Sequence, residues 1–274
     1  MKSIKKIKEE ISHTTQIKGI VEVFEEISAI RMKKIRDEIL MTRDFLERLA
    51  NLSNEVGSDF YEVDENKRSA TVYLSSSSGM YGDLPEKVFN SFLDHIKDKS
   101  TELFIFGKQG KTYIEKYRPN LKFRYYELDD KKNTMDTISE SLQMLLNYGQ
   151  ITVFYGKFKN IVNQDAASQS IMGDYHDKFG NLSEKELNER RFKNIYEPSV
   201  MEVQVKFATE IKTSVFEGML KENDLAKTAS RLMHLDKAYE SIDQKLALLE
   251  ITRNRENKKL EDKKQQERVK RLWV

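Results

Sequence analysis

The chain has 274 residues, and its 47 Lys+Arg against 45 Asp+Glu give a formal net charge of +2, too near neutral for bulk charge to indicate a nucleic-acid binder. It contains no cysteine, which excludes disulfides, thiol catalysis and cysteine-ligated zinc. Its four histidines are too far apart in sequence to share a helical turn, so we expect no metal site. The high charged fraction, 34%, is typical of long exposed helices.

No stretch of the sequence predicts a membrane-spanning helix. The longest run without a charged residue, 141–156, includes Gln, Asn and Thr and is shorter than the roughly 20 apolar residues that a bilayer requires. The first dozen residues mix Lys, Glu and Ile, unlike a signal peptide. We therefore expect a soluble, intracellular protein.

Glycine and proline divide the chain into three parts. Apart from Gly19, every one of these helix-breaking residues lies between Gly57 and Gly218, so both ends are almost free of them. This distribution predicts an N-terminal helix over 1–56, an inserted domain over 57–198 and a C-terminal helix over 199–274.

Both ends carry apolar residues at helical spacing. In the N-terminal part these residues are Ile4, Ile7, Ile11, Ile17, Val21, Phe24 and Ile27. In the C-terminal part they are Ile211, Val215, Met219, Ala229, Leu232, Leu235, Tyr239, Ile242, Leu246 and Leu249. Spacings of three and four place such residues on one face of a helix. We expect the two stripes to bury each other in an antiparallel coiled coil.

The middle of the chain alternates strand-like and helix-like segments. Short β-branched and aromatic runs predict strands over 70–75, 102–106, 122–127 and 151–155. Helical patterns fall between them, over 85–97, 110–117 and 133–148. This alternation predicts an α/β fold, in which a Rossmann-like parallel sheet covered on both sides is inserted between the terminal helices.

Two stretches after the last predicted strand are harder to assign. Residues 160–195 are polar and weakly patterned, which predicts a loop with a short helix near 183–191. The run Val203, Val205, Phe207 alternates like a strand, so the spacing alone leaves the start of the last helix ambiguous.

The sequence offers no credible active site and no cofactor motif. The segment after the first strand, SSSSGMYG at 75–82, has neither a G-x-G-x-x-G spacing nor a G-K-[ST] ending. GKQGK at 107–111 is compatible with a phosphate cradle, but a strand-to-helix turn that needs glycine explains it better. Ser75–Ser78 is likewise better explained as a polar turn than as nucleophiles. We expect a protein that is not an enzyme.

The C-terminal tail is basic. Residues 253–272 hold nine Lys/Arg and four Asp/Glu, with no aromatic residue among them. Either a solvated helix with i,i+4 ion pairs or a surface for a partner explains this composition. Of the functional alternatives, a protein partner is favoured over nucleic acid.

Five segments, in order along the chain, resemble the gamma subunit of F-type rotary ATPases. They are IKKIKEEISHTTQI at 4–17, GKQGKTY at 107–113, YGKFKNIVNQ at 155–164, YEPS at 196–199 and SRLMHL at 230–235. The last three are similar to the family's Tyr-Asn-Lys-Phe-Lys, Phe/Tyr-Glu-Pro-Ser and Ala-Arg-Met-Met-Ala-Met elements. The resemblance implies that the long C-terminal helix begins at Val200 despite the strand-like alternation.

The sequence also departs from the family at functional positions. Residues 254–258 are Asn-Arg-Glu-Asn-Lys where the family has Asn-Lys-Ala-Arg-Gln, and residues 21–26 are bulkier and more acidic than the family's small residues. Met80–Asp83 replaces a Leu-Cys-Gly-Gly turn, and the tail ends in a charged helix with Leu272 and Trp273. These differences predict a divergent paralogue.

The resemblance implies a central rotor shaft that turns inside a hexamer of catalytic and non-catalytic nucleotide-binding subunits. A further stalk subunit can belong to the complex, whose foot would meet a proton-transporting membrane rotor or other machinery, such as a gliding motility apparatus, at the inner face of the cell membrane. A static coiled-coil scaffold with an α/β docking module is the alternative. The residues assigned to the ring contact are Val21, Phe24, Asn254, Arg255, Asn257 and Lys258.

Overall fold

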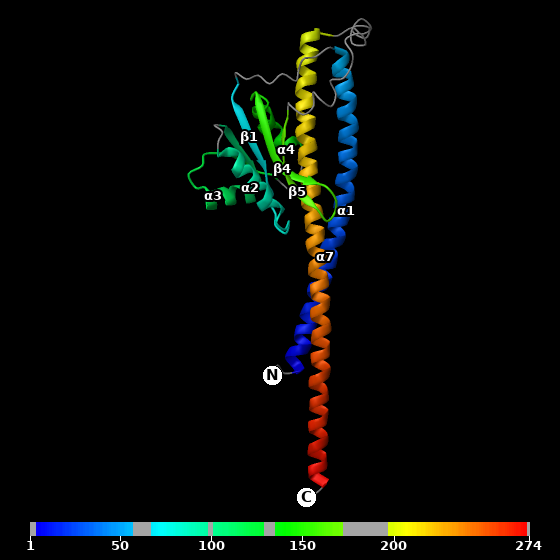
Figure 1. The fold of residues 1–274 in the computed structure, drawn as a ribbon. Helices are drawn as coiled ribbons and strands as arrows, with labels where there is room; N and C mark the ends of the chain where they lie inside the picture. The colour runs from blue at the N-terminus through cyan, green and yellow to red at the C-terminus, as the bar shows by residue number, and fades with distance from the viewer. Residues whose placement is uncertain (1–3, 57–66, 98–100, 129–134, 172–196, 273–274) are drawn as a thin grey trace. The chain divides into compact units, whose positions relative to one another are not determined.

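The computed structural model describes residues 4–56, 67–97, 101–128, 135–171 and 197–272. The chain forms two compact units, one from Met1–Ile30 with Leu232–Val274 and the other from Arg31–Arg231. We call them the helical unit and the α/β unit. Two long helices, α1 (Ile4–Val56) and α7 (Val200–Leu272), contribute residues to both (Figure 1).

The α/β unit contains a five-stranded sheet of order β3-β2-β1-β4-β5. The strands are β1 (Ser69–Leu74), β2 (Glu102–Phe106), β3 (Arg124–Tyr126), β4 (Gln150–Phe158) and β5 (Gln164–Ser170). The first four are parallel, with Val72 of β1 lying between Phe104 and Val153, whereas β5 runs antiparallel to β4.

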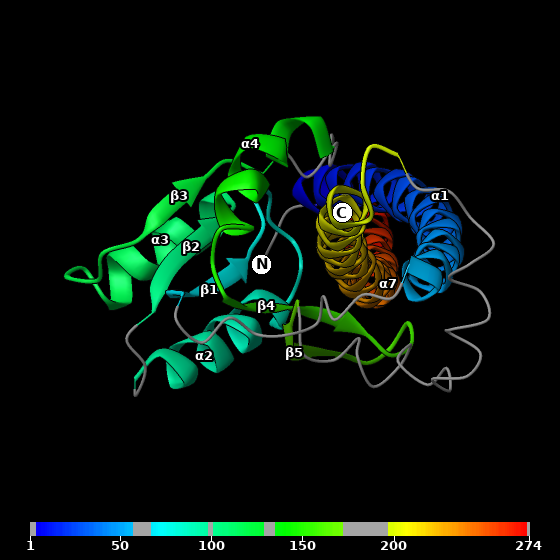
Figure 2. The same ribbon diagram turned by 90° about the horizontal axis from the view of Figure 1, so that it is seen from above.

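Helices cover both faces of the sheet, as Figure 2 shows for α2 (Leu84–Ile96) and α4 (Met135–Leu145) on opposite sides. Buried side chains alternate along β1, because successive residues of a strand point to opposite faces. Val72 and Leu74 join the core beneath α4, while Tyr73 joins the core beneath α2 and α3 (Lys108–Tyr117). The predicted α/β fold is confirmed.

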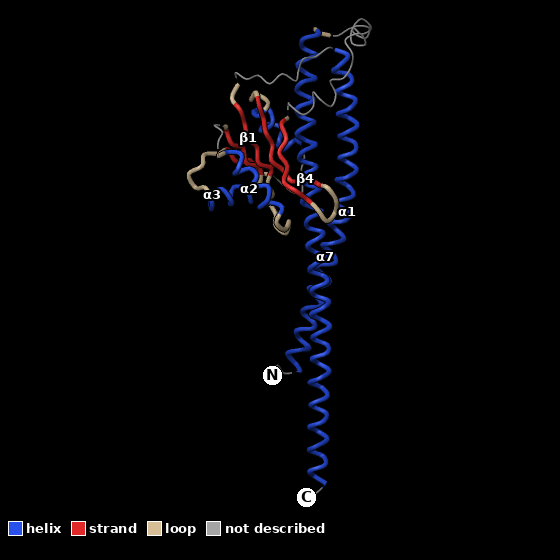
Figure 3. Tube along the Cα trace, viewed as in Figure 1, coloured by secondary structure: helices blue, strands red, loops and turns tan. Residues whose placement is uncertain are grey.

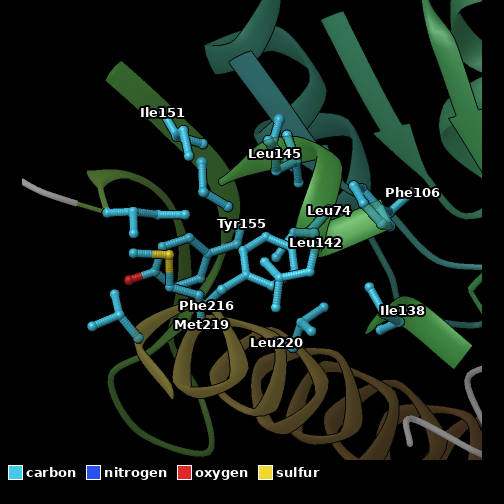
Figure 4. Close-up of a cluster of buried hydrophobic side chains, with 14 of the residues drawn as sticks. Leu74, Phe106, Ile138, Leu142, Leu145, Ile151, Tyr155, Phe216, Met219 and Leu220 are labelled. Atoms are coloured by element: carbon cyan, nitrogen blue, oxygen red, sulfur yellow. The ribbon is translucent and has the colours of Figure 1, made fainter. Parts of the chain in front are cut away.

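The middle of α7 completes one of these two cores. Phe216, Met219 and Leu220 lie against the sheet and α4, and the Phe216 ring is 5.9 Å from that of Phe106 (Figure 4). The predicted α7 stripe therefore packs on the sheet in the α/β unit as well as on α1. Burying a Phe or Leu side chain contributes roughly 1.5–3 kcal/mol, so this contact ties the helix firmly to the domain.

The prediction of loop over residues 160–195 is wrong for β5. Its sequence, QDAASQS, has no large apolar residue to give a strand pattern, because only the small side chains of Ala166 and Ala167 pack against the two cores and the strand is joined to β4 through its backbone. A turn that precedes it supplies the missing signal: Asn160 Oδ1 accepts hydrogen bonds from the amides of Val162 and Asn163. The sheet is therefore mixed rather than wholly parallel. The helix predicted near 183–191 lies outside the described residues.

The start of the last helix agrees with the resemblance and not with the strand-like alternation. α7 begins at Val200, where Ser199 Oγ accepts a hydrogen bond from the amide of Glu202, 3.2 Å away, as an N-cap does. Among the described helices, none combines the length and apolar composition that crossing a bilayer requires.

The predicted apolar stripe of α1 is wrong in its second half. Ile7 is buried, but Ile17 and Ile27 are 52% and 54% exposed. The inward-facing positions of the helix repeat about every 3.5 residues, the coiled-coil period, and they pass through Thr14, Lys18 and Ser28 rather than the isoleucines. The predicted isoleucines, which are spaced by three and four, therefore leave the inward face of the helix and continue onto a neighbouring, exposed face.

Candidate partner-binding surfaces

Two ion pairs join the antiparallel helices of the helical unit. Lys18 of α1 pairs with Asp243 of α7, and its ammonium lies 4.4 Å from the centre of the Tyr239 ring. Lys245 lies 3.8 Å from Glu10. The hydrogen bond with Asp243, followed by that with Tyr239, raises the pKa of Lys18, so this lysine is charged at physiological pH.

The seam between these helices contains buried hydroxyls among its apolar residues. Thr14 and Ser28 are buried and donate hydrogen bonds to the carbonyls of Glu10 and Phe24 on their own helix, both at 2.7 Å. Neither hydroxyl therefore needs a partner across the seam. Small polar residues at these positions bury little apolar area, so the helical unit has a narrow core.

The apolar surface of α1 in this unit faces outward instead. We call the following residues the α1 stripe: Ile17, Ile20, Val23, Phe24, Ile27 and Ile30. All are at least 41% exposed, and they recur at the spacing of one helix face and its margin. A contiguous exposed apolar patch of this kind marks a surface for a partner.

The end of α7 extends beyond the start of α1 (Figures 1 and 3). Lys245 is level with Glu10, so the described part of α1, which begins at Ile4, does not reach the residues of α7 beyond about 256. Every residue from Lys258 to Arg271 is exposed. From Lys258 onward the basic tail is therefore a solvated stretch of helix, supported within itself by pairs such as Lys259–Glu256 at 2.7 Å.

The predicted ring-contact residues fall on two separate levels of the helical unit. Phe24 is exposed and belongs to the α1 stripe, whereas Val21 is half-buried on the seam. Asn254, Arg255 and Lys258 are exposed and Asn257 is half-buried. Counted from the Lys18–Asp243 pair at about 1.5 Å per residue, Phe24 and Asn254 lie roughly 25 Å apart along the helices. The structure does not bring the two groups together.

Sequence reasoning misses most of the α1 stripe as a candidate surface. It places Ile17 and Ile27 in the buried seam against α7, and it gives Ile20 no role. The signal that could find them is the 3.5-residue repeat, because following it from Ile7 leads to Thr14, Val21 and Ser28 and leaves the isoleucines outside.

The space beside the glycine turn at 107–111 in the α/β unit is filled by the loop that follows β1. Gly107 has a φ of +98°, and a Cβ there would lie 2.9 Å from the amide nitrogen of Ser76. The amide of Gln109 donates to the Ser76 carbonyl, and that of Lys108 donates to Ser77 Oγ. These first amides of α3 are thus used by the loop after β1, which favours the turn interpretation over a phosphate cradle.

The serines that precede α2 use their hydroxyls in hydrogen bonds that hold the same loop. Ser77 Oγ donates to the Leu128 carbonyl at 2.5 Å, and Ser78 Oγ is 2.7 Å from the Tyr81 hydroxyl. No histidine accompanies them in these contacts, which favours the polar-turn interpretation over nucleophilic catalysis. Among the described residues, no group of three or more potential ligands could hold a metal ion.

Two hollows in the α/β unit have contrasting linings. A largely apolar pocket of about 340 Å³ is lined by Leu49, Pro198, Val203 and Phe207 together with Glu197, Glu202, Lys206 and Glu210. A polar hollow of about 460 Å³ surrounds Glu102, which is held by Arg68 at 3.0 Å, Arg124 at 3.2 Å and the Tyr148 hydroxyl at 2.6 Å. The Tyr148 and Arg68 hydrogen bonds lower the pKa of Glu102.

Sequence comparison finds relatives along almost the whole chain. The chain is 23% identical over 270 residues to the ATP synthase gamma chain of Ruthia magnifica, with 92% of each chain covered. It is also 23% identical to that of Flavobacterium johnsoniae, with 93% of this chain and 92% of the relative covered.

Solved structures show the same fold at lower identity. The rotor of the Euglena gracilis mitochondrial ATP synthase matches with a TM-score of 0.63 at 15% identity, over 94% of this chain and 98% of that one. A central-stalk chain from Tetrahymena thermophila matches with a TM-score of 0.56 at 16% identity, over 80% and 99%. The ATP synthase family model matches residues 3–259. This chain therefore belongs to the ATP synthase family, as a homologue of its gamma chains.

Proposed function

We propose that this chain is the central shaft of an F-type or F-type-like rotary ATPase. In this proposal the helical unit occupies the bore of a hexamer of catalytic and non-catalytic nucleotide-binding subunits. The observation that carries it is the exposed α1 stripe, because a two-helix unit that leaves six large apolar side chains outside needs a surrounding partner. The relatives named above, gamma chains and rotors, support the same role.

The proposed shaft acts by contact and not by chemistry. The α1 stripe lies on one side of one helix, so a ring around it meets different surfaces in different directions. Subunits that contact the stripe and subunits that contact charged residues then differ in conformational free energy. Shaft orientation and nucleotide occupancy bias each other through that difference, which links hydrolysis or synthesis to rotation.

Two levels of contact follow from the positions of the candidate residues. Phe24 and its neighbours in the α1 stripe would form an apolar bearing. Asn254, Arg255, Asn257 and Lys258 would form a polar contact about 25 Å away along the helices. Val21 offers a ring only part of its side chain, because it is half-buried on the seam. Exposed polar side chains suit a contact that must form and break at each step, because it costs little desolvation.

The three-part division of the chain belongs to this proposal. Residues 1–56 and 199–274 would supply the shaft, and residues 57–198 the foot that meets the driven machinery. The complex would lie at the inner face of the cell membrane without entering it. The bulkier, acidic stretch at 21–26 and the basic tail support a specialised ATPase, for example a motility-linked one, over a proton-driven synthase.

Purification of the tagged chain from its native host tests the shaft assignment. We expect a co-purifying ring of nucleotide-binding subunits, several copies per shaft, with ATPase activity. A variant carrying Ile17→Gln, Ile20→Gln and Ile27→Gln should recover less ring, whereas a matched variant at exposed charged positions, Lys5→Gln with Glu9→Gln, should recover as much as the parent. Recovery of the chain without nucleotide-binding partners would favour the scaffold alternative.

The same preparation distinguishes the specialised motor from a synthase. A proton-conducting membrane sector among the partners would overturn the specialised assignment, whereas filamentous or surface machinery would support it. Charge reversal at Arg255 and Lys258 tests the polar contact separately. Unchanged ring binding and an unchanged ATPase rate would remove those residues from the proposal.

A further inference from the structure

One short segment of α7 in the α/β unit is buried and yet polar. We call Asn223–Arg231 the polar segment. Within it, Asn223, Asp224, Lys227, Thr228 and Ser230 are at most 5% exposed. A buried polar group is costly unless it is hydrogen-bonded, so each of these side chains must have a specific partner.

The first partner is helix α1. Arg31 directs one guanidinium nitrogen at both carboxylate oxygens of Asp224, at 2.7 and 3.0 Å, and Lys227 Nζ lies 3.9 Å from the same carboxylate. Two cations thus surround one buried carboxylate. A shift of α7 by one turn, about 5.4 Å, would separate Asp224 from Arg31 and leave a buried charge without its partner on α1.

The second partner is the central region of the sheet. Asn223 Oδ1 accepts a hydrogen bond from the backbone amide of Gly156 in β4, at 2.8 Å. A Cβ at position 156 would lie 3.0 Å from Leu84 and 3.2 Å from Asn223 Oδ1, so glycine is what allows the helix to approach this closely.

The third partner is the loop between β1 and α2. Ser230 Oγ donates to the Tyr81 carbonyl at 2.8 Å, and Arg231 donates to the Gly79 carbonyl at 2.9 Å. The Arg231 guanidinium also lies 4.4 Å from the centre of the Tyr81 ring. Met80 in this loop has a φ of +66°, a strained conformation for a residue other than glycine, which surrounding contacts must hold in place.

Directional contacts and apolar contacts constrain a helix differently. Apolar side chains along α7 recur every turn, so a helix displaced by one turn can still bury apolar area. The hydrogen bonds of the polar segment have no such repeat, because each joins one atom to one partner. Buried polar residues at helix interfaces are best attested in this role of specifying register.

We propose that the polar segment fixes α7 axially and rotationally against α1, β4 and the β1–α2 loop, so that torque on the helix passes to the α/β domain. The first part of this proposal, that the polar segment fixes the position of α7, concerns the chain alone, and we call it the register half. The second part, that torque passes from α7 to the α/β domain, rests on the proposed shaft function, and we call it the torque half. The two halves are tested by different measurements, so the failure of one is distinguishable from the failure of the other.

Introduced cysteines test the register, because the chain has none of its own. Ile39 and Leu225 lie in one buried cluster, so Ile39→Cys with Leu225→Cys reports the native register. Ile39→Cys with Lys221→Cys or with Ala229→Cys reports a shift of one turn. In the parent chain we expect disulfides from the first pair only.

The test variant replaces the whole buried charge cluster with apolar residues, Arg31→Leu, Asp224→Leu and Lys227→Met, a change that buried ion pairs and triads often tolerate without loss of stability. We expect the shifted pairs to cross-link at least tenfold faster than in the parent. The control is the exposed pair on α1, Asp44→Leu with Arg48→Leu, 3.0 Å apart, which should change nothing. Equal cross-linking ratios in test variant and parent would overturn the proposal.

A milder variant covers the case in which the triple variant does not fold. Ser230→Ala with Arg231→Ala removes the side-chain hydrogen bonds to the carbonyls of Tyr81 and Gly79 and the contact with the Tyr81 ring. Leu84→Cys with Ala226→Cys then reports the register against the domain, since both side chains flank Gly156. A slower disulfide at this pair than in the parent would support the proposal, and an unchanged rate would contradict it.

The assembled complex tests the torque half. With the test variant as shaft, we expect the ring to continue to hydrolyse ATP, while rotation of a probe fixed to the α/β domain shows slips or lost steps. Continuous rotation with full torque would overturn the torque half. A chain that recruits no ring would instead count against the proposed function and leave the cross-linking result standing.

Discussion

The Arg31 guanidinium on α1 forms two hydrogen bonds with the carboxylate of Asp224 on α7, at 2.7 and 3.0 Å. Asp224 is 5% exposed, so the carboxylate depends on its cations for the interactions that water would otherwise supply. Because this pair joins the two helices within the α/β unit, its removal should show in stability before it shows in any activity.

Replacing only one member of this charge cluster should be more damaging than replacing all three. We expect Arg31→Leu to lower the free energy of unfolding by roughly 3 kcal/mol, because it leaves Asp224 buried beside Lys227 alone. The triple variant Arg31→Leu, Asp224→Leu and Lys227→Met should recover most of that loss, because no buried charge then remains in the cluster. Urea denaturation of the isolated chain measures both, and the exposed control Arg48→Leu should cost less than about 1 kcal/mol. Equal losses in the single and triple variants would contradict the prediction.

Two glycines should respond to alanine with opposite signs. Gly107→Ala should destabilise the chain by about 1–3 kcal/mol, because its φ is +98° and the new Cβ would meet the Ser75–Ser76 backbone. Gly19 is in the interior of α1, and a Cβ there would have no other atom within 4 Å, so Gly19→Ala should stabilise the helix by up to about 1 kcal/mol. Thermal unfolding of the two variants provides the comparison, and a stabilised Gly107→Ala chain would refute the close-approach argument.

The α1 stripe should matter for assembly and not for folding. Ile20→Gln and Ile27→Gln should change the free energy of unfolding of the isolated chain by less than about 0.5 kcal/mol, because both side chains are more than half exposed. Ile7→Gln, at a buried position, should cost several times as much. Denaturation curves and ring recovery should thus separate the variants of the α1 stripe from the variant of the buried Ile7. A stripe variant that unfolds as easily as Ile7→Gln would place the stripe in the core.

Glu102 should make folding sensitive to acid. Its hydrogen bonds with Tyr148 and Arg68 lower its pKa in the folded chain, so the unfolded chain binds the proton more readily. The stabilisation is therefore present above about pH 4.5, the ordinary value for Glu, and is lost as the pH falls through the folded pKa. Glu102→Gln should remove this part of the acid dependence. Unfolding midpoints of parent and variant, compared at pH 7 and pH 4, should differ more at pH 7; equal differences would contradict the assignment.

How far the sequence predicts each element depends on which physical signal that element uses. The strands through Val72, Phe104 and Val153 are buried on both faces, so they consist of β-branched and aromatic residues, and this composition predicts them. β5 is defined by backbone pairing with β4 and by the Asn160 turn, and its side chains carry no such pattern. Composition therefore predicts strands that are buried on both faces, but it does not predict a strand such as β5.

The candidate surfaces divide in the same way. Phe24, Asn254, Arg255 and Lys258 are exposed, and their proposed contact with a ring stays a prediction. The burial of Asp224 and Lys227 is not predictable, because charged residues in a helix are most often on its solvent side and only the packing of Arg31 and Tyr81 around them shows otherwise. Because Arg31 and Tyr81 are far from Asp224 and Lys227 along the chain, the residues next to Asp224 and Lys227 in the sequence do not indicate that these side chains are buried.

The antiparallel strand at the end of the described sheet has a consequence for solubility. A terminal strand offers unpaired amides and carbonyls along one side, and other chains can extend such an edge into aggregates. β5 counters this with a sequence of glutamines, serines, an aspartate and alanines, and Asp165 pairs with Lys159 across the hairpin. Without large apolar side chains, a strand added from another molecule would gain backbone hydrogen bonds but little buried area. The weak patterning that hides β5 from sequence reasoning thus also leaves the edge of the described sheet with little apolar surface.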